Sequence, residues 1–588
     1  MTKPLLACDT ETRGLGGELL GLVFYGHYHP SSDPESYVFS KESALKNKER
    51  LQHDFFDAHT IVFHNAKYDL MILRREGFVI NDYHDTMLMA HLLNPLMPCS
   101  LDETAKRYLG KGKIEIEDKG HLEWTPETIE YCLKDTELTY NLCLVLLKEL
   151  EEDPKQLKWY LETELPFVEA ILEMERIGLV IDRNRTIEAI NEYEVKVENA
   201  LADVRAIAPL VPGKEVIYKR EDDPGFGYFA KHGVLTWNHC KLEEFNPASG
   251  DHIIHVLKSM GWEPEKLTQS GKPSTEADVL EELDYPIIKN ILVYKDYQKA
   301  IGTYLEAFLN YSEPLAGEYA VLYGNFNQCG TITGRLSSSQ PNLQNIWTSG
   351  DIGSTIRSLV TVPDGYDLIS IDLSNIEART LAHYLSLVFG FTTLAHAFRD
   401  GLDFHQVNAD TWQCTRQQAK TLLYALLYGA GPKKLSVQMG VTVAEAKDAV
   451  AKVYDGMPIM QLKESVWDVC RKRKGTIYTA MGRRLYYPHI NSRDHEKKAR
   501  AERQVFNALL QGSAADVLKV LTLAVLPTAH IMGAFLAGSI HDELLLYVPE
   551  ANSRGLADYL EQVFQRPLLS HCPIKGDAKI GKNWKEVH

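Results

Sequence analysis

D-L-I-S-I-D-L-S-N-I-E-A-R, residues 367–379, joins a strand-like apolar run to a helix-like run, with an acidic residue on each side of the junction. Asp372 lies where the apolar β character ends, and Glu377 lies about one turn into the next, helical pattern. By itself this pattern fits either a metal-binding carboxylate or a buried strand that ends in a solvated acid. The choice depends on what the rest of the chain can place beside it.

A second strand-like run, G-S-I-H-D-E-L-L-L-Y-V at residues 538–548, carries the neighbouring acids Asp542 and Glu543. If the two runs lie on opposed strands, Asp372 and Asp542 can hold two Mg²⁺ ions about 3.5 to 4 Å apart. That arrangement favours the in-line attack of a 3′ hydroxyl on a nucleotide phosphate. The two runs together predict a nucleotidyl-transfer centre, to which we assign all three acids.

Between these runs, R-Q-Q-A-K-T-L-L-Y-A-L-L-Y-G at residues 416–429 predicts a helix with a cationic and aromatic face. Side chains recurring every four residues form a slowly drifting stripe of Arg416, Lys420, Tyr424 and Tyr428. The cations can bind triphosphate oxygens, and the rings can stack on a base or a sugar. An ordinary amphipathic helix would also expose Arg and Lys. Here, however, the leucines supply a separate apolar side, which leaves the tyrosines without a packing role.

Near the amino terminus, D-T-E places Asp9 and Glu11 on one face at the end of an apolar strand, where two carboxylates can share a metal ion. Because D-x-E is common on surface loops, it is informative only together with two later segments. F-H-N-A-K-Y-D supplies Asp69, and Y-C-L-K-D supplies Tyr131 and Asp135 one helical turn apart. Acids around two divalent ions can activate water against a phosphodiester, and Tyr131 can orient that water.

These amino-terminal segments resemble the proofreading 3′→5′ exonucleases, which bind metal with four acids and place a tyrosine beside them. The resemblance implies that the metal ligands are Asp9, Glu11, Asp69 and Asp135. It gives Asp85, in H-D-T-M, no ligand role, and we expect that residue to cap a helix.

The two acidic runs and the stripe between them resemble motifs A, C and B of the family A, or polymerase I-like, DNA polymerases. Other segments match that family in order: F-N-P-A-S-G-D-H-I at 245–253, T-I-T-G-R-L-S-S-S-Q-P-N-L-Q-N-I at 331–346, G-R-R-L-Y-Y-P-H-I-N-S-R at 482–493 and A-E-R-Q-V-F-N-A-L-L-Q-G-S-A-A-D at 501–516. The resemblance covers nearly the whole chain, from Asp9 to Glu543.

This resemblance also implies roles for individual residues. Arg416 and Lys420, assisted by His405, would bind the incoming triphosphate, and Lys420 would protonate the pyrophosphate leaving group as a general acid. Glu377 would exclude a ribose 2′ hydroxyl, and Tyr428 would help to form the pocket of the nascent base pair. Contacts with primer and template, through minor-groove acceptors that are nearly independent of sequence, would come from Arg335, Arg503, Asn507, Gln511 and His541.

The chain departs from the family pattern at five positions near the expected nucleotide site. Leu373, Asn375 and Ala378 leave the ligands intact but change the pocket around them. Tyr424 stands where many members have Phe, and in the family a Tyr there accompanies the acceptance of dideoxynucleotides. We therefore expect dideoxy terminators to be incorporated readily. Nothing in the sequence explains Ala425, which replaces the usual Gly.

The fold that the resemblance implies is multidomain, α/β and α+β: a ribonuclease H-like exonuclease domain followed by a right-hand polymerase domain. A length of 588 residues is too great for one hydrophobic core and agrees with this division. We expect strands at 5–8 and 19–25, followed by helical patterns to about residue 150. The expected bounds are 1–155 for the exonuclease and 156–588 for the polymerase, with the thumb at about 160–315, the palm at about 316–395 and 505–588, and the fingers at about 396–504.

The net charge of −17 is unusual for a protein that binds nucleic acid, so the distribution of charge matters more than its sum. Residues 471–503 hold eleven Lys or Arg against three acids, a local charge of +8 that can follow a phosphate backbone. The nine cysteines form no C-x-x-C pair, which predicts free thiols in a reducing compartment. An acidic amino-terminal segment without a long apolar run predicts a cytoplasmic protein, in the host cytoplasm if it is phage-encoded.

Residues 520–540 are apolar over a length that can span a bilayer, but Pro527, His530 and Gly533 interrupt them. A buried helix followed by a buried strand fits this segment better. We expect no membrane association.

The proofreading acids and the lack of a 5′ nuclease segment resemble the short replicative polymerases of podophages. This predicts phage genome replication, with primer-template DNA, dNTPs and replisome proteins as partners. Some of these relatives recruit host thioredoxin through a long basic thumb insertion. The corresponding stretch here, about 213–244, is short and carries charges of both signs, which argues against thioredoxin.

Three other functions fit less of the sequence. A nuclease-only repair enzyme would leave the stripe at 416–429 and Asp542 without a role. A non-catalytic DNA-binding scaffold would need neither carboxylate set. A single-subunit RNA polymerase can share the metal-binding acids, but Glu377 and the proofreading acids oppose it.

Overall fold

The computed structural model describes residues 3–588 except positions 15, 30–31, 115–122, 219–236, 265, 269–270, 316, 348–349 and 428. The chain forms two compact units that are both discontinuous in sequence. The first unit consists of Met1–Leu179, Tyr323–Asn345 and Val362–His588, and the second consists of Val180–Leu322 and Ile346–Thr361.

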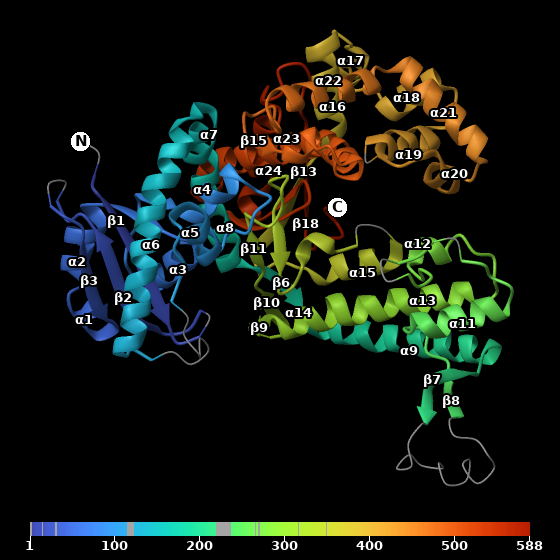
Figure 1. Cartoon of the computed structure of the whole chain (residues 1–588), viewed down its shortest axis with the longest axis horizontal. Coiled ribbons are helices and arrows are strands. Elements are labelled where there is room, and N and C mark those ends of the chain that lie inside the picture. The colour runs from blue at the N-terminus through green and yellow to red at the C-terminus, as the bar shows by residue number, and fades with distance from the viewer. Residues whose placement is uncertain are drawn as a thin grey trace. The chain divides into compact units, whose positions relative to one another are not determined.

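The amino-terminal part of the first unit is a mixed sheet covered by helices (Figure 1). Its strands are β1 (Leu5–Thr12), β2 (Leu19–Gly26), β3 (Glu35–Ser40), β4 (Thr60–Phe63) and β5 (Tyr83–Asp85). Its helices are α1 (Lys41–Lys46), α2 (Lys48–Leu51), α3 (Ala66–Arg75), α4 (Thr86–Leu93), α5 (Leu101–Leu109), α6 (Pro126–Glu151), α7 (Pro154–Trp159) and α8 (Leu165–Ile177). The strand order is β3-β2-β1-β4-β5, and the long helix α6 packs on β1 and β2. The central strands are therefore buried and apolar, as their sequence predicts.

Three strands of this sheet do not appear in the sequence-based expectation, which places only helical patterns after residue 25. β4 and β5 have four and three residues, too few for a recognisable alternation. β3 lies at the sheet edge with no buried residue, so it lacks an apolar face. Pairing with the buried neighbours, rather than local pattern, makes these segments strands.

The carboxyl-terminal part of the first unit is built on an antiparallel sheet of β13 (Tyr366–Leu373), β16 (Phe535–Ile540), β17 (Glu543–Pro549) and β18 (Gly576–Gly581). The order is β16-β17-β13-β18, so the two acidic runs of the sequence lie on neighbouring strands. Four helices accompany the sheet: α8, which packs on β16, together with α16 (Ile376–Phe389), α23 (His495–Ile531) and α24 (Ser553–Val563). Helix α24 packs on β13, β17 and β18, and α16 packs on the long helix α23.

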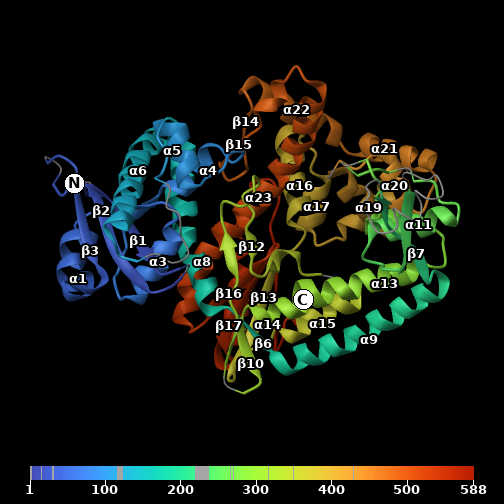
Figure 2. The ribbon, with the colours of Figure 1, turned by 60° about the horizontal axis from the view of Figure 1, so that its bottom comes forward.

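A helical group lies between α16 and α23 in sequence (Figure 2). It contains α17 (Thr393–Arg399), α18 (Phe404–Trp412), α19 (Arg416–Leu427), α20 (Pro432–Met439), α21 (Val443–Gly456) and α22 (Ile459–Lys472). Small hairpins complete the unit: β11 (Asn325–Asn327) with β12 (Ser337–Ser339), and β14 (Thr476–Tyr478) with β15 (Arg484–Tyr486). Trp412, Leu423 and Phe506 share one buried cluster, which joins these helices to α23.

The second unit is mainly helical. Its helices are α9 (Arg183–Ile207), α11 (Gly250–Ser259), α12 (Ala277–Leu280), α13 (Ile288–Lys299), α14 (Glu306–Asn310) and α15 (Gly350–Leu359). Its strands are β6 (Leu179–Asp182), β7 (Leu210–Tyr218), β8 (Trp237–Glu244), β9 (Ser312–Pro314) and β10 (Tyr319–Leu322). The long helices α9 and α13 pack along each other.

One helix in the described part of the chain, α23, is long and apolar enough to cross a membrane. Of its apolar window 78% is buried inside the protein, as in the core helix of a globular domain. The helix continues through Pro527 to Ile531 and is followed by the buried strand β16, so the expected helix and strand are confirmed. The sequence suggests an interruption at Pro527, but the helix continues through this residue.

Candidate active sites

The first carboxylate cluster is formed by residues of one strand and two helices. Asp9 and Glu11 lie on β1, Asp69 lies on α3, and Asp135 lies on α6. Thr10 fastens α3 to β1, because its backbone N–H (3.0 Å) and its hydroxyl (2.7 Å) both donate to Asp69 Oδ1. The four acids that the sequence predicts as ligands are thus brought to one place from distant parts of the chain.

Burial and mutual repulsion dominate the electrostatics of this cluster. The pKa of Asp9 is well above its usual value because the group is desolvated and because Asp69 and Asp135 add like charge. Burial raises the pKa of Asp69 to about 7, against the hydrogen bonds from Thr10 that lower it. Crowded carboxylate oxygens of this kind are the donors that a hard divalent cation prefers. The residues therefore fit the metal ions that the sequence predicts.

Lys113 also reaches this cluster, and no sequence motif singles it out. It forms an ion pair with Asp135, and its Nζ lies 4.7 Å from the centroid of the Tyr131 ring. Although burial lowers it, the pKa of Lys113 is raised overall by the Asp135 carboxylate, so the ammonium stays charged. The positive charge makes Lys113 a part of the site, next to the predicted catalytic tyrosine.

Cys132 is a second contributor that the motifs do not identify. Its thiol donates to Glu11 Oε2 over 3.4 Å. Ligand atoms of Asp9, Glu11 and Cys132 all lie within 4.8 Å of one another. Burial raises the pKa of the Cys132 thiol far above its usual value, so the thiol acts as a hydrogen-bond donor to the cluster.

Asp85 caps a helix, as expected. Its carboxylate accepts from the backbone N–H groups of Met87 (2.8 Å) and Leu88 (3.3 Å) at the start of α4. It also accepts from Ala66 N–H (2.8 Å) at the start of α3. Asp85 therefore helps to fix the helix that carries Asp69.

The second carboxylate cluster lies at the end of β13 and at the turn between β16 and β17. Asp372 is directly opposite Glu543 across the sheet, and Leu373 N–H donates to the carbonyl of Asp542 (3.1 Å). Asp542 lies in the turn and not on a strand as expected, because His541, with a φ of 55°, reverses the chain between two antiparallel strands. Burial, and then the charge of Asp542, raises the pKa of Asp372 to about 6. The two acids are therefore close, which fits a shared divalent cation.

Arg335 bridges this cluster to α16. Its Nη2 lies 2.7 Å from Glu377 Oε1 and 3.5 Å from Asp542 Oδ1. Glu377 is buried, whereas Arg335 is partly exposed. Arg335 thus lies at the predicted synthetic centre itself and orients the residue expected to exclude the ribose hydroxyl.

Glu543 faces inward. It is buried, and its carboxylate accepts from the Ser370 hydroxyl and from Trp584 Nε1, which lies 3.1 and 3.2 Å from its two oxygens. These donors make Glu543 a support for the β13–β17 pair. Its direct catalytic role stays a prediction.

The predicted stripe of α19 is present as far as Tyr424, and Tyr428 lies outside the described residues. Arg416 and Lys420 are exposed, and the separate apolar side is confirmed by the buried residues Leu422, Leu423, Leu426 and Leu427. Arg416 Nε lies 2.5 Å from Asp403 Oδ2, so its charge is held at the start of the helix.

Tyr424 connects α19 to the second cluster. Its hydroxyl donates to Asn375 Oδ1 over 3.4 Å. Burial, followed by the charges of Glu377 and Asp542, raises the pKa of Tyr424 to about 12. The helix of the cationic stripe therefore ends next to the carboxylates.

His405 lies on α18 behind the same stripe. Its ring is buried, with its centroid 5.9 Å from that of Tyr424. Burial, and then the charges of Lys420 and Arg416, lowers the pKa of His405 to about 4. The imidazole is therefore neutral near pH 7, and among the described residues its Nδ1 has no hydrogen-bond partner. An unpaired buried nitrogen suits a ligand contact.

The expected DNA contacts divide between two cavities. Arg335 and His541 line one of about 280 Å³, together with Asp542. Arg503 and Asn507, one turn apart on α23, line another of about 200 Å³ beneath the end of α19. Gln511 continues the same helix face and is partly buried.

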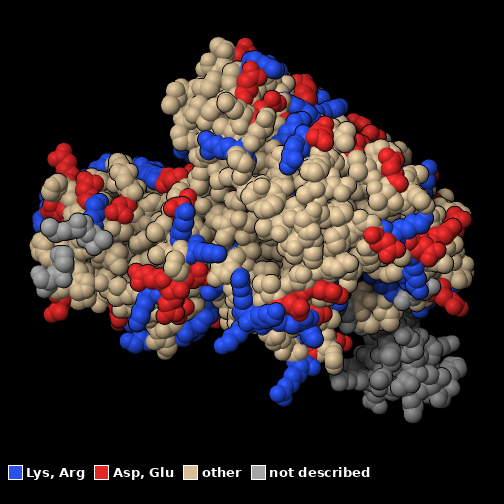
Figure 3. Space-filling model, turned by 90° about the horizontal axis from the view of Figure 1, so that it is seen from above, with Lys and Arg blue, Asp and Glu red and all other residues tan. Residues whose placement is uncertain are grey.

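The basic stretch 471–503 is less free than its charge suggests. Arg483 is buried with its Nε 2.7 Å from Asp516 Oδ1, and Arg471 pairs with Asp468 (2.9 Å). On the face seen in Figure 3, acidic and basic side chains lie next to each other in several groups, around a broad area without charged side chains. The exposed positive charges of the stretch include Lys472, Lys474, Arg493 and Arg500.

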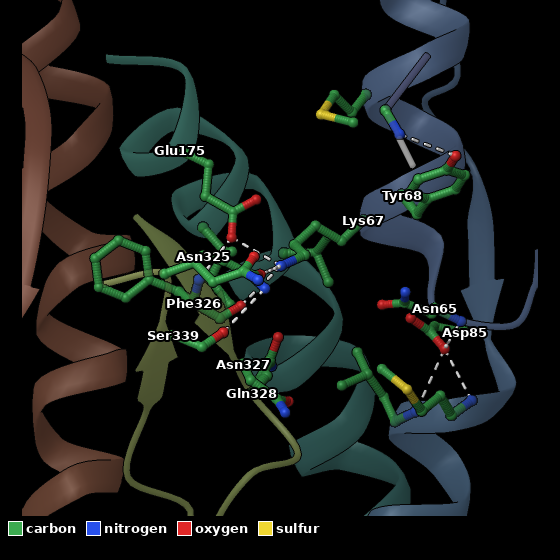
Figure 4. A pocket seen from close by; sticks show the side chains of 17 residues that line it. Asn65, Lys67, Tyr68, Asp85, Glu175, Asn325, Phe326, Asn327, Gln328 and Ser339 are labelled. Atoms are coloured by element: carbon green, nitrogen blue, oxygen red, sulfur yellow. Dashed lines mark hydrogen bonds and ion pairs between the residues drawn. The ribbon is translucent and has the colours of Figure 1, made fainter. Parts of the chain in front are cut away.

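A cavity of about 450 Å³ lies between α3 and the β11–β12 hairpin (Figure 4). On one side Lys67 Nζ donates to Glu175 and to Asn325 Oδ1, each at 2.7 Å. Tyr68 and Asn65 line the side that belongs to α3 and its amino terminus. Helix α3 thus contributes Lys67 and Tyr68 to this cavity and Asp69 to the first carboxylate cluster.

Two family models match the chain. The model described as DNA polymerase family A matches residues 235–586, more than half of the chain. The model described as 3'-5' exonuclease matches residues 2–151. The first range includes the second carboxylate cluster, and the second range includes the first cluster.

Curated bacterial proteins are similar over most of the chain. The thermostable DNA polymerase I of Thermus thermophilus is 30% identical over 532 residues, which cover 88% of this chain and 57% of that protein. DNA polymerase I of Pseudomonas aeruginosa is 30% identical over 632 residues, covering 99% of this chain and 64% of its own length. The chain thus spans about three fifths of these relatives.

A solved structure has a similar fold. It is the POL domain of Pol1 from M. smegmatis, in complex with DNA primer-template and dNTP. The TM-score is 0.83 at 24% sequence identity, and the match covers 99% of this chain and 96% of that chain.

Proposed function

Because the chain belongs to DNA polymerase family A, we propose that it synthesises DNA on a template from dNTPs and proofreads the product with a 3′→5′ exonuclease. The observation that carries the proposal is the proximity of Asp372 and Asp542, which come from distant parts of the chain and lie beside α19. The exonuclease match at the first cluster supports the second activity.

In the proposed synthetic centre, Asp372 and Asp542 hold two Mg²⁺ ions. When bound, such ions activate the 3′ hydroxyl and stabilise charge on the leaving oxygen. Arg416 leaves its ion pair with Asp403 and binds the incoming triphosphate instead. The neutral imidazole of His405 also contacts the triphosphate. Lys420 is the general acid that donates a proton to the leaving pyrophosphate.

The remaining residues select the nucleotide and hold the DNA. Arg335 keeps Glu377 against the sugar position, where the carboxylate excludes a ribose 2′ hydroxyl. Tyr424 and Tyr428 face the nascent base pair. Primer and template are contacted in the minor groove by Arg335, Arg503, Asn507, Gln511 and His541.

In the proposed exonuclease centre, Asp9, Glu11, Asp69 and Asp135 hold two divalent ions. Tyr131 orients the attacking water, with Asp135 one helical turn away on the same helix.

Extension of a primed template with dNTPs and Mg²⁺ tests both assignments. Asp372→Ala is expected to stop synthesis and leave degradation of the primer intact. Asp9→Ala is expected to stop degradation only. Undiminished extension by Asp372→Ala would show that the synthetic centre lies elsewhere.

We further propose an exonuclease domain at 1–155, a polymerase domain at 156–588 and a role in phage genome replication, with replisome proteins as candidate partners. The role is supported by the sequence resemblance to podophage polymerases, whereas the curated relatives are bacterial. The stretch about 213–244, on which thioredoxin binding would depend, falls largely outside the described residues. Copying of a long primed circle with and without thioredoxin tests this partner: equal product lengths are expected.

A further inference from the structure

Lys113 has no assigned role, although it lies inside the first carboxylate cluster. It comes after α5 in the chain and reaches across to α6, where its ammonium pairs with Asp135 and lies over the Tyr131 ring. The Lys113 side chain is 23% exposed and that of Asp135 is 5% exposed. The contact is therefore largely removed from water, where a charge pair is stronger than on a surface.

The charge of Lys113 acts on more than its direct partner. It lowers the pKa of both Asp9 and Glu11, in opposition to their burial. Three of the four proposed metal ligands thus interact with the same ammonium. A purely structural tie between α5 and α6 would not need to be placed among these acids.

An ammonium and a divalent cation compete for the same carboxylate oxygens. Lys113 pairs with Oδ2 of Asp135, so a metal ion that binds this oxygen has to displace the ammonium. The lysine side chain has a flexible four-carbon stem and can take another partner. The phosphate of a bound DNA strand is such a partner.

We propose that Lys113 is a built-in competitor for the divalent cation at Asp135, so that the second ion enters the exonuclease centre fully only when DNA draws the lysine away. The inference rests on the proposed exonuclease function. It makes metal binding and single-strand binding mutually reinforcing, because DNA draws Lys113 away from the metal's ligand, and the metal releases Lys113 to bind the DNA phosphate.

Titration with Mn²⁺, followed by the electron paramagnetic resonance of free Mn²⁺, tests this without any reaction. All proteins carry Asp372→Asn and Asp542→Asn, so that the polymerase centre contributes no site. Lys113→Met is expected to bind the weaker Mn²⁺ ion roughly tenfold more tightly than the parent, the size of effect that close charge pairs commonly show. Lys113→Arg keeps the cation and is expected to bind like the parent.

Two further measurements isolate the mechanism. In Asp135→Asn, the added change Lys113→Met is expected to tighten Mn²⁺ binding by clearly less than it does in the parent, because only the longer-range effect of the charge on Asp9 and Glu11 is then removed. A short oligothymidylate is expected to tighten Mn²⁺ binding by the parent but not by Lys113→Met. Thermal melting verifies that each variant is folded, and Lys113→Gln replaces Lys113→Met if the latter is not.

Equal or weaker Mn²⁺ binding by Lys113→Met and Lys113→Gln overturns the proposal. So does an oligothymidylate effect that is the same with and without the lysine. If Asp9→Asn leaves Mn²⁺ binding intact, the proposed exonuclease centre itself fails, and this outcome is distinct from a failure of Lys113 alone.

Discussion

The two carboxylate clusters contain the same kind of ligand but differ in their enclosure. In the first, Asp69 and Asp135 are buried, and Lys113 supplies positive charge from within. In the second, Asp372 is accessible to solvent at the end of a sheet strand, although the atoms packed around its carboxylate partly desolvate it, and Arg335 approaches from one side. An enclosed cluster suits the end of a single strand, whereas an open sheet suits a duplex. Access, more than ligand chemistry, therefore distinguishes the two proposed reactions.

The largest expected effect is the loss of one activity with retention of the other. Asp542→Asn should lower single-turnover extension roughly a thousandfold or more, because a metal ligand stabilises transition-state charge directly. Asp69→Asn should lower the degradation of a single strand to a similar extent. Each variant should retain the other activity. A substitution that lowers both rates equally would mean that the clusters are not separate centres.

Substitution of Lys420 tests whether this residue acts as a general acid in the proposed synthetic centre. Lys420→Ala should lower the extension rate by about a hundredfold to a thousandfold, the usual range for a general acid. Lys420→Arg should preserve triphosphate affinity but not the rate, because a guanidinium does not give up its proton. Pre-steady-state kinetics over a pH series measures both quantities. An unchanged rate with weaker dNTP binding would assign Lys420 to binding alone.

The buried cluster should make the metal-free protein sensitive to pH. The folded-state pKa of Asp69 is about 7, above the usual 3.8, so the folded state retains a proton that the unfolded state has lost. The contribution of Asp69 to stability should therefore be fully present below about pH 4 and fall by on the order of a few kcal/mol as pH rises to about 7. Thermal melts in a chelator measure this. Relative to Asp69→Asn, the parent should lose stability as pH rises over this range, and excess Mg²⁺ should restore it. The same pH dependence in both metal-free proteins would contradict the expectation.

The smallest expected effect concerns Tyr424. Its hydroxyl can supply the contact that a missing 3′ hydroxyl leaves open, so the protein should incorporate dideoxynucleotides readily. Tyr424→Phe should restore discrimination by about tenfold, the value of one hydrogen bond in a desolvated site. Competition between ddNTP and dNTP in primer extension gives the ratio. Equal incorporation of dideoxynucleotides by both forms would show that the Tyr424 hydroxyl has no such role. Asn375→Ala is the control for loss of the hydrogen bond that the Tyr424 hydroxyl makes in this structure.

The order of the domains could be predicted from the sequence. An exonuclease domain followed by a polymerase I-like polymerase domain is confirmed by both family models and by the similar solved structure. The pairing of Asp372 with the β16–β17 region could be inferred from two apolar runs that end in acids. These features could be predicted because each depends on a contiguous segment with a recognisable motif.

Other features could not be predicted because they depend on tertiary contacts. Lys113 resembles any surface lysine until α5 brings it to Asp135. Arg483 adds to a basic stretch in sequence, yet Asp516 on α23 buries its charge. Glu543 belongs to the same acidic motif as Asp542, yet its carboxylate also accepts a hydrogen bond from Trp584, which the motif does not predict. In each case a partner distant in sequence decides the role.

The contacts of Lys67 have a further consequence. This residue shares the first turn of α3 with Asp69 and is bonded to Asn325 and Glu175, which lie outside the exonuclease match at 2–151. A change at Asn325 is therefore expected to shift the helix that presents Asp69, a ligand of the proposed exonuclease centre. On the proposed function, substitutions that touch neither set of acids would then alter the ratio of synthesis to degradation.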